Sequence, residues 1–281
     1  MKMNFVEKLL AASRQQESLL CVGLDPEPGR LPASLRQEPV MSAIVRFCQD
    51  IIAATAPYAC AFKPNLAFFE VLGPAGLQAF QEVVQAVPAH IPVIADAKRG
   101  DIGNTARAYA KTFFETYGCD AVTVNPYMGY DSVAPFLEYR DKGTLLLCRT
   151  SNPGARDIQD LRVQNENGTL RPLYEVIAQR VQSWNTAGNC GLVVGATYPE
   201  ELRQIRTICP QTPILIPGIG AQGGDLEAAV QAGADAQGEL AIISSSRAIL
   251  YASEGEDFAQ AAAAEARRTR DQINAARQKQ G

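Results

Sequence analysis

Short apolar runs alternate with longer segments whose apolar residues recur at helical spacing along most of the 281-residue chain. The runs predict strands and the segments between them predict helices. After an amphipathic first helix within residues 1–16, the strand–helix order repeats eight times. The predicted strands lie at 18–24, 59–62, 92–95, 120–124, 144–148, 191–194, 213–216 and 240–243. The predicted helices lie at 41–56, 76–87, 101–117, 132–140, 171–186, 200–208, 225–232 and 258–277.

This order predicts an α/β protein with a (β/α)8 TIM-barrel fold and an additional N-terminal helix, in a single domain spanning residues 1–281. A doubly wound sheet shares the alternation, but its G-x-G-x-x-G fingerprint is missing after the first strand. The glycines Gly218, Gly220 and Gly223 give that spacing only after the seventh strand. The one long connection without a clear period, residues 151–171, is interpreted as an active-site lid loop, with a disordered insertion as the alternative.

Charge and composition argue against several classes of protein. The net charge is −4 and no run of Lys or Arg occurs, which argues against a nucleic-acid-binding surface. No apolar stretch approaches the ~20 residues of a bilayer span. The first helix mixes Lys2, Glu7, Lys8 and Arg14 with apolar positions at helical spacing, so we expect an amphipathic helix and not a signal peptide. We therefore expect a cytoplasmic protein that binds neither nucleic acid nor membrane.

The cysteines and the single histidine exclude further kinds of site. Seven cysteines with no C-x-x-C pair predict reduced, mostly buried thiols. His90 is the only histidine, so a Cys–His nucleophile has one candidate base and a histidine-based metal site is nearly excluded. A Mg²⁺ site built from carboxylates is not excluded by these counts.

Polar residues fall where the predicted strands end. Asp96 and Lys98, two residues apart, share one side of an extended chain. A salt bridge at the strand end, with Asp101 capping the next helix, is the plain structural alternative. In a TIM barrel, however, the carboxyl ends of the strands carry the active site. The polar residues at these ends are, in order, Asp25, Lys63, Asp96 with Lys98, Asn125, Ser151, Gln222 and Arg247.

The seventh and eighth loops predict a class of ligand. The segment P-G-I-G-A-Q-G-G at 217–224 offers backbone N–H groups ahead of a helix, which suit a phosphate. Arg247, just past the eighth strand, adds a fork of donors. These two loops form the recurrent phosphate site of the fold. We therefore expect a phosphorylated small-molecule substrate.

The segment D-A-K-R-G-D-I-G-N-T at 96–105 closely resembles the D-x-K-x-x-D-I-x-x-T signature of orotidine 5′-phosphate decarboxylase. The motifs G-L-D-P, F-K-P-N, T-S-N-P-G, P-G-I-G-A-Q-G-G and S-S-S-R follow in the family's order. The resemblance covers nearly the whole chain and is closest to the larger bacterial branch, as found in mycobacteria and myxobacteria. It implies decarboxylation of orotidine 5′-monophosphate (OMP) to UMP and CO₂, the last step of de novo UMP biosynthesis, without a metal or cofactor.

The resemblance also implies a role for each matching residue. Lys98 would donate a proton to C6 of the pyrimidine, Asp96 would face the scissile carboxylate, and Lys63 and Asp101 would complete a Lys-Asp-Lys-Asp array. Asp101, Ile102 and Thr105 would reach the neighbouring subunit's site in a homodimer. The substrate contacts implied are Asp25, Lys63, Ile102, Thr105, Ser151, Pro217, Gln222 and Arg247. The family usually has Gly where this chain has Ser246.

Two alternatives remain at this point. A related Mg²⁺-dependent enzyme, of the 3-keto-L-gulonate 6-phosphate decarboxylase or hexulose-6-phosphate synthase type, shares D-x-K-x-x-D but not the context of Lys63. A catalytically silent phosphate-binding barrel is the other, and the intact charged array argues against it.

Overall fold

Eight parallel strands form the centre of the computed structural model, which describes residues 3–164, 167–219 and 225–279. The strands are β1 (Leu20–Leu24), β2 (Ala61–Pro64), β3 (Ile94–Arg99), β4 (Ala121–Val124), β5 (Gly143–Arg149), β8 (Cys190–Val194), β9 (Ile214–Ile216) and β10 (Ala241–Ser245). Their order in the sheet is β2-β1-β10-β9-β8-β5-β4-β3. Parallel bridges from Phe62 to Val93 and from Asn65 to Asp96 join the two outer strands, which closes the sheet into the predicted barrel.

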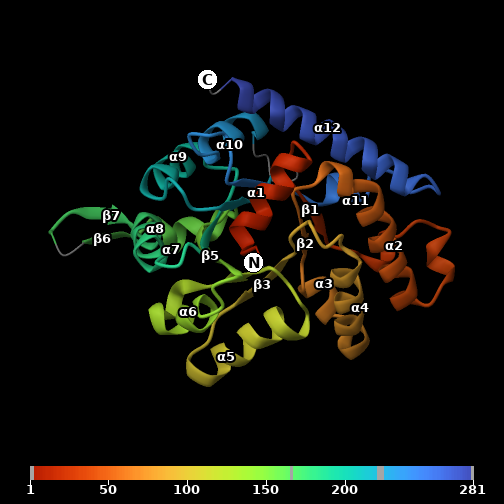
Figure 1. Cartoon of the computed structure of the whole chain (residues 1–281), viewed down its shortest axis with the longest axis horizontal. Coiled ribbons are helices and arrows are strands. Elements are labelled where there is room, and N and C mark those ends of the chain that lie inside the picture. The colour runs from red at the N-terminus through yellow and green to blue at the C-terminus, as the bar shows by residue number, and fades with distance from the viewer. Residues whose placement is uncertain (1–2, 165–166, 220–224, 280–281) are drawn as a thin grey trace.

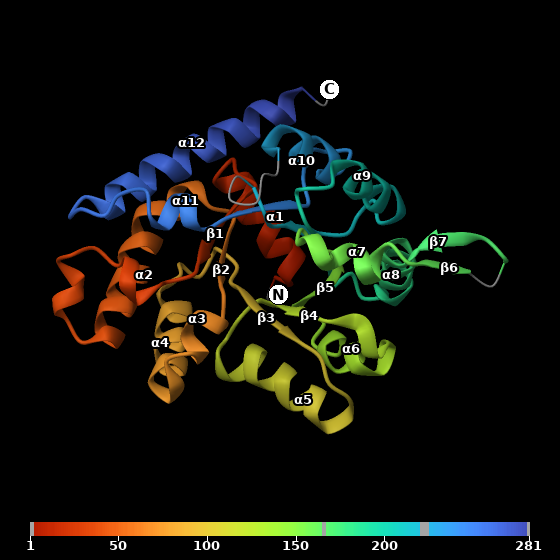
Figure 2. The same cartoon turned by 180° about the vertical axis from the view of Figure 1, so that it is seen from behind.

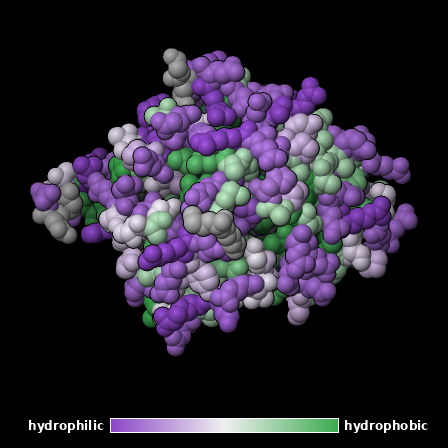
Figure 3. Space-filling model, in the orientation of Figure 1, coloured by the Kyte–Doolittle hydropathy of each residue, from purple (hydrophilic) through white to green (hydrophobic). Residues whose placement is uncertain are grey.

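The helices surround this barrel (Figures 1 and 2). They are α1 (Phe5–Gln15), α2 (Val40–Thr55), α3 (Ala67–Glu70), α4 (Gly73–Ala86), α5 (Gly103–Lys111), α6 (Tyr130–Leu137), α7 (Arg156–Gln159), α8 (Leu173–Trp184), α9 (Pro199–Ile208), α10 (Leu226–Gly233), α11 (Arg247–Leu250) and α12 (Phe258–Gln278). The long helix α12 lies across the outside, beside α2 and α10. The face shown in Figure 3 is mostly hydrophilic, with apolar residues visible in patches.

The barrel interior is filled by one buried side chain from each strand. These are Cys21, Ala61, Ile94, Ala121, Leu145, Val193, Leu215 and Ile242. Phe5 and Leu9 of α1 belong to the same cluster, so the first helix closes the amino-terminal end of the barrel. A β-carbon on Gly143 would lie 2.4 Å from the Phe5 ring, and this strand position must therefore stay small. With that end closed, the interior opens toward the carboxyl ends of the strands.

Alternation along the strands explains why polar groups line that opening. Successive side chains of a strand point to opposite faces, so residues two apart share a face. Lys63 follows Ala61, Asp96 follows Ile94, Thr123 follows Ala121, and Ser244 follows Ile242. Apolar residues thus fill the lower interior, and the polar residues two positions later form a layer above them.

The prediction that no apolar stretch approaches a bilayer span needs a correction. Among the described residues, Val40–Tyr58 is long and apolar enough to cross a membrane by length and composition. This segment is α2 and the turn that follows it. Its residues Ile44, Phe47 and Ile51 are fully buried against the rest of the molecule. Packing in the core accounts for its apolar character.

The connection after β5 is not the structureless loop that the sequence indicated. It contains a 3₁₀ turn at Pro153–Ala155, helix α7, and a hairpin of β6 (Arg162–Gln164) and β7 (Leu170–Pro172). The hairpin projects away from the barrel beside α8 in both views (Figures 1 and 2). The lid role of residues 151–171 stays a prediction.

Candidate active site

A cavity of about 430 Å³ opens at the carboxyl ends of the strands. It brings together seven of the residues singled out from the sequence: Asp25, Lys63, Asp96, Lys98, Ser151, Pro217 and Arg247. They come from or directly follow six different strands, which agrees with the position expected for an active site in this fold.

The centre of the site is the carboxylate of Asp96, which lies between two ammonium groups. Lys63 Nζ donates to Asp96 Oδ2 at 2.9 Å, and Lys98 Nζ donates to Asp96 Oδ1 at 2.6 Å. The side chains of Lys63 and Asp96 are 6% and 10% exposed, whereas that of Lys98 is 51% exposed. The two lysines therefore differ in role: Lys63 is part of the floor, and Lys98 faces the cavity with room for a ligand.

The ionisation of these groups follows from their mutual contact. Burial alone would raise the pKa of Asp96, but the charges of Lys63 and Lys98 outweigh burial and hold that pKa below its usual value. Burial alone would lower the pKa of Lys63, but Asp96 and Asp25 outweigh it and raise that pKa above its usual value. At neutral pH the site therefore holds a carboxylate and an ammonium, both charged and both largely out of water.

The juxtaposition of Asp96 and Lys98 is confirmed, but its local cause differs from the prediction. Strand β3 runs to Arg99, four residues beyond the predicted end, so both side chains belong to the strand itself. Lys98 has φ +47°, in the left-handed region that non-glycine residues seldom occupy. The chain there is irregular rather than extended.

The loop that carries Asp25 is fixed by Tyr251. The Tyr251 hydroxyl donates to the backbone oxygen of Asp25 at 3.1 Å and accepts from the amide of Glu27 at 2.8 Å. Oδ1 of Asp25 is buried and has no hydrogen-bond partner within the described residues. A buried acceptor of this kind can receive a hydrogen bond from a ligand hydroxyl.

The predicted phosphate end is partly described. Pro217, Gly218, Ile219 and Arg247 line the cavity. Gln222 lies outside the described residues, as does most of the glycine-rich segment. The first turn of α10 is already capped, because Asp225 Oδ1 accepts from the amide of Ala228 at 3.1 Å. Asp225 therefore already satisfies one of the amides at the start of α10.

Ser246 lies where the family usually has glycine, and the structure shows how it is accommodated. A β-carbon on Gly23 would lie 1.8 Å from Ser246 Oγ. The missing side chain at Gly23 thus makes room for the hydroxyl of Ser246, which lines the cavity.

The two residues before Ser151 are held by contacts to the end of helix α7 and the residue after it. Gln159 of α7 accepts from the amide of Thr150 at 2.9 Å and donates to its hydroxyl at 2.9 Å. The fully buried Arg149 reaches Asp160 at 3.2 Å. The segment following Ser151 is therefore anchored to the end of β5 by polar contacts at its base.

The three residues expected to act across a subunit interface lie outside this cavity. Asp101 Oδ1 accepts from the amide of Ile102 at 2.8 Å. Ile102 is 56% exposed, and Thr105 is also exposed. Helix α5 begins at Gly103 with Ile102 as its N-cap residue, so Asp101 does not cap the helix. Asn125 accepts from the amide of Tyr127 at 3.0 Å and forms a turn, consistent with its sequence context.

Several residues of the site were not singled out from the sequence. Asn65, Asn152 and Ser244 line the cavity. Thr123 is buried and bonds Asp96 from the neighbouring strand. The strand period was the available signal, because Thr123 and Ser244 are polar residues at positions that share a face with apolar interior residues.

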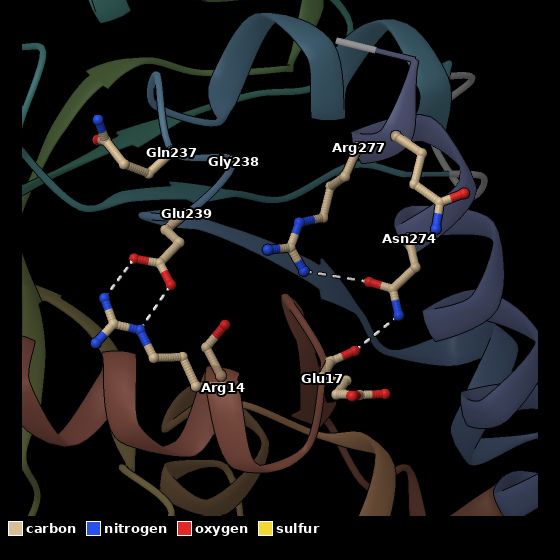
Figure 4. A pocket seen from close by; sticks show the side chains of 9 residues that line it. Arg14, Glu17, Gln237, Gly238, Glu239, Asn274 and Arg277 are labelled. Carbon is tan, nitrogen blue, oxygen red and sulfur yellow. Dashed lines mark hydrogen bonds and ion pairs between the residues drawn. The ribbon is translucent and has the colours of Figure 1, made fainter. Parts of the chain in front are cut away.

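A second cavity, shown in Figure 4, lies at the opposite end of the barrel. Arg14 binds Glu239 through two hydrogen bonds of 2.8 Å. Arg277 donates to Asn274 at 3.3 Å, and Asn274 donates to the backbone oxygen of Glu17 at 2.7 Å. These contacts join the end of α1 to α12 and to the approach to β10.

All seven cysteines are buried and free, as predicted. Burial raises the pKa of Cys21 to about 12 and that of Cys209 to about 11. These thiols are protonated at neutral pH and are poor nucleophiles.

Comparisons with known proteins agree with this geometry. Residues 18–263 match the model of the family described as "Orotidine 5'-phosphate decarboxylase / HUMPS family". The chain belongs to this family. It is 54% identical over 277 residues to an orotidine 5′-phosphate decarboxylase of Azoarcus sp., covering 98% of this chain and 100% of that one. It is 52% identical over 272 residues to that of Dehalococcoides mccartyi, covering 97% and 98%.

The fold of the family is also confirmed. The structure of Leishmania donovani OMP decarboxylase superposes with a TM-score of 0.85 at 43% identity, covering 98% of this chain and 99% of that chain. These relatives bear the name of the OMP enzyme, so the sugar-phosphate alternative is not favoured.

Proposed function

We propose that this protein decarboxylates orotidine 5′-monophosphate to UMP and CO₂, the last step of de novo UMP biosynthesis. The observation that carries the proposal is the buried Asp96 carboxylate, bridged by Lys63 and Lys98 at the mouth of the barrel. Family membership and the cavity that joins this array to Arg247 support it.

The reaction requires that the negative charge developing on one carbon atom, C6, be stabilised. When the bond from C6 to the carboxylate breaks, CO₂ leaves and the electron pair stays on C6. A fixed ammonium beside C6 stabilises this developing charge more than it stabilises the ground state, and that difference accelerates the reaction. Lys98 is the ammonium that faces the cavity, and its proton then passes to C6. Water restores the proton afterwards.

The other charged residues position the substrate. Asp96 would face the departing carboxylate and disfavour its bound state through like charge. Lys63 keeps Asp96 ionised and, with Asp25, would hold the ribose hydroxyls. Ser151 would bind the pyrimidine edge, and Arg247, Gln222 and Pro217 the phosphate side. Binding energy from the phosphate would then orient the ring over Lys98.

We extend the proposal to a homodimer in the cytoplasm. The exposure of Ile102 and Thr105 beside Asp101 leaves these residues available to a second copy of the chain. The Lys-Asp-Lys-Asp array would then be completed by the partner subunit's Asp101. Segment 151–171 would close over the bound substrate, with its base held by Gln159 and Arg149.

Replacement of Lys98 tests the proposal. Lys98→Ala should reduce CO₂ release from OMP by about 10⁴-fold or more, because proton donation and charge stabilisation are both lost. UMP binding and the unfolding transition should persist. Lys111→Ala, at an exposed lysine on α5, is the matched control and should retain full activity. A Lys98→Ala protein with turnover near that of the control would refute the mechanism.

A further inference from the structure

A bulge interrupts the parallel pairing of β3 with its neighbour β4 next to the charged array. Ala95 pairs with Val122 and Arg99 pairs with Val124, so the segment 96–98 faces Thr123 alone. Bulges of this kind bend a strand, redirect side chains and interrupt the ladder of backbone hydrogen bonds. Here the bulge places Asp96 and Lys98 on the cavity side, with Lys98 at φ +47°.

The hydroxyl of Thr123 replaces the missing ladder acceptors. Its Oγ1 accepts from the amide of Ala97 at 3.0 Å and from the amide of Lys98 at 2.9 Å. The same atom lies 3.1 Å from Oδ1 of Asp96. Because the two amides can only donate, the single hydroxyl proton is left for the Asp96 carboxylate. Thr123 is 1% exposed, so water does not compete for these bonds.

We propose that Thr123 is a positioning residue for the decarboxylation: its hydroxyl sets both the carboxylate of Asp96 and the backbone from which Lys98 presents its ammonium. The inference rests on the proposed function, since it assigns Lys98 and Asp96 their catalytic roles. The contacts of the Thr123 hydroxyl are to the Asp96 carboxylate and to the backbone amides of Ala97 and Lys98. Thr123 therefore acts through the two residues to which the proposed mechanism assigns the chemistry.

Loss of the hydroxyl has a definite local consequence. Two partly buried amides lose their acceptor, and the Asp96 carboxylate loses one donor. The left-handed conformation of Lys98 then lacks a tether, and its ammonium shifts relative to C6. A misplacement of about 1 Å lowers turnover by about 100-fold. Contacts at the phosphate and ribose are unchanged, so the loss falls on kcat rather than on KM.

Three variants test this assignment. Thr123→Val keeps the shape and removes the hydroxyl, and Thr123→Ser keeps the hydroxyl. Thr144→Val is the matched control: Thr144 is a fully buried threonine on the adjacent strand β5, and its hydroxyl has no hydrogen-bond partner within the described residues. Steady-state kinetics with OMP and thermal unfolding are measured for each.

The expected result is a kcat lowered about 100-fold in Thr123→Val with KM changed less than about twofold, and recovery to within about threefold in Thr123→Ser. Thr144→Val should match the unmodified protein. Equal kcat values for Thr123→Val and Thr144→Val would overturn the inference, as would a loss confined to KM. If Thr123→Val does not fold, Thr123→Ala takes its place and must show a loss of at least about tenfold in kcat. Absence of OMP turnover in the unmodified protein would instead reject the proposed function.

Discussion

The two lysines that share Asp96 offer a comparison in which burial is the main variable. Lys63→Met and Lys98→Met each remove one ammonium from the same carboxylate and keep an unbranched side chain of similar length. At an effective dielectric constant of about 20, an ion pair at about 3 Å is worth about 5–6 kcal/mol before desolvation is counted. By distance alone Lys98, at 2.6 Å, should matter at least as much as Lys63, at 2.9 Å.

The different solvent exposure of the two lysine side chains reverses the expected order of their contributions to stability. The Lys63 side chain is 6% exposed, so its removal leaves a buried carboxylate with one partner fewer, and we expect a cost of about 3–5 kcal/mol in unfolding free energy. The Lys98 side chain is 51% exposed and water replaces much of its interaction, so we expect about 1 kcal/mol or less.

Urea unfolding at pH 7, followed by circular dichroism, measures both free energies under one set of conditions. Added salt should reduce the small effect of Lys98→Met more than the large effect of Lys63→Met, because buried pairs are screened less. If the two variants lost equal stability, or Lys98→Met lost more, the argument that burial controls this array would be refuted.

Two further predictions concern the same site. A β-carbon at Gly195 would lie 2.8 Å from the backbone nitrogen of Ser151, so Gly195→Ala should displace the proposed pyrimidine contact and lower kcat/KM for OMP by about tenfold or more. Gly29→Ala is the control and should have full activity, because nothing lies within 4 Å of a β-carbon there. Equal kinetics for the two variants would contradict the close packing at Gly195. Because the pKa of Asp96 is lowered in the folded state, its ionised form stabilises the fold above about pH 4, and this contribution is lost as the pH falls further. The unfolding free energy should therefore fall less steeply between pH 5 and pH 3 in Asp96→Asn than in the unmodified protein. Parallel pH profiles for the two proteins would show that Asp96 contributes nothing to acid sensitivity.

The strand–helix alternation was sufficient to predict the barrel, because short apolar runs and the helical period are local properties of the sequence. The polar residues at the strand ends followed from the same pattern. Six of them line one cavity together with Pro217, since parallel strands deliver their carboxyl ends to the same side.

Features that depend on contacts between distant segments were not predictable. The insertion of Phe5 and Leu9 into the barrel is one such case, because an amphipathic helix has no pattern that identifies the surface it will cover. The bulge at Thr123 is another: extended geometry placed Asp96 and Lys98 correctly on one side, but the left-handed Lys98 arises from pairing with β4. The hairpin after α7 depends on pairing between β6 and β7, which the polar composition of the segment concealed.

The most direct test of the central claim is CO₂ release from orotidine 5′-monophosphate by the purified protein with excess EDTA present. The proposed role of Lys98 requires only the charged groups of the protein, so we expect full release under these conditions. No CO₂ release from OMP in EDTA, together with Mg²⁺-dependent turnover of a sugar phosphate, would contradict the proposal and assign the protein to the related sugar-phosphate enzymes.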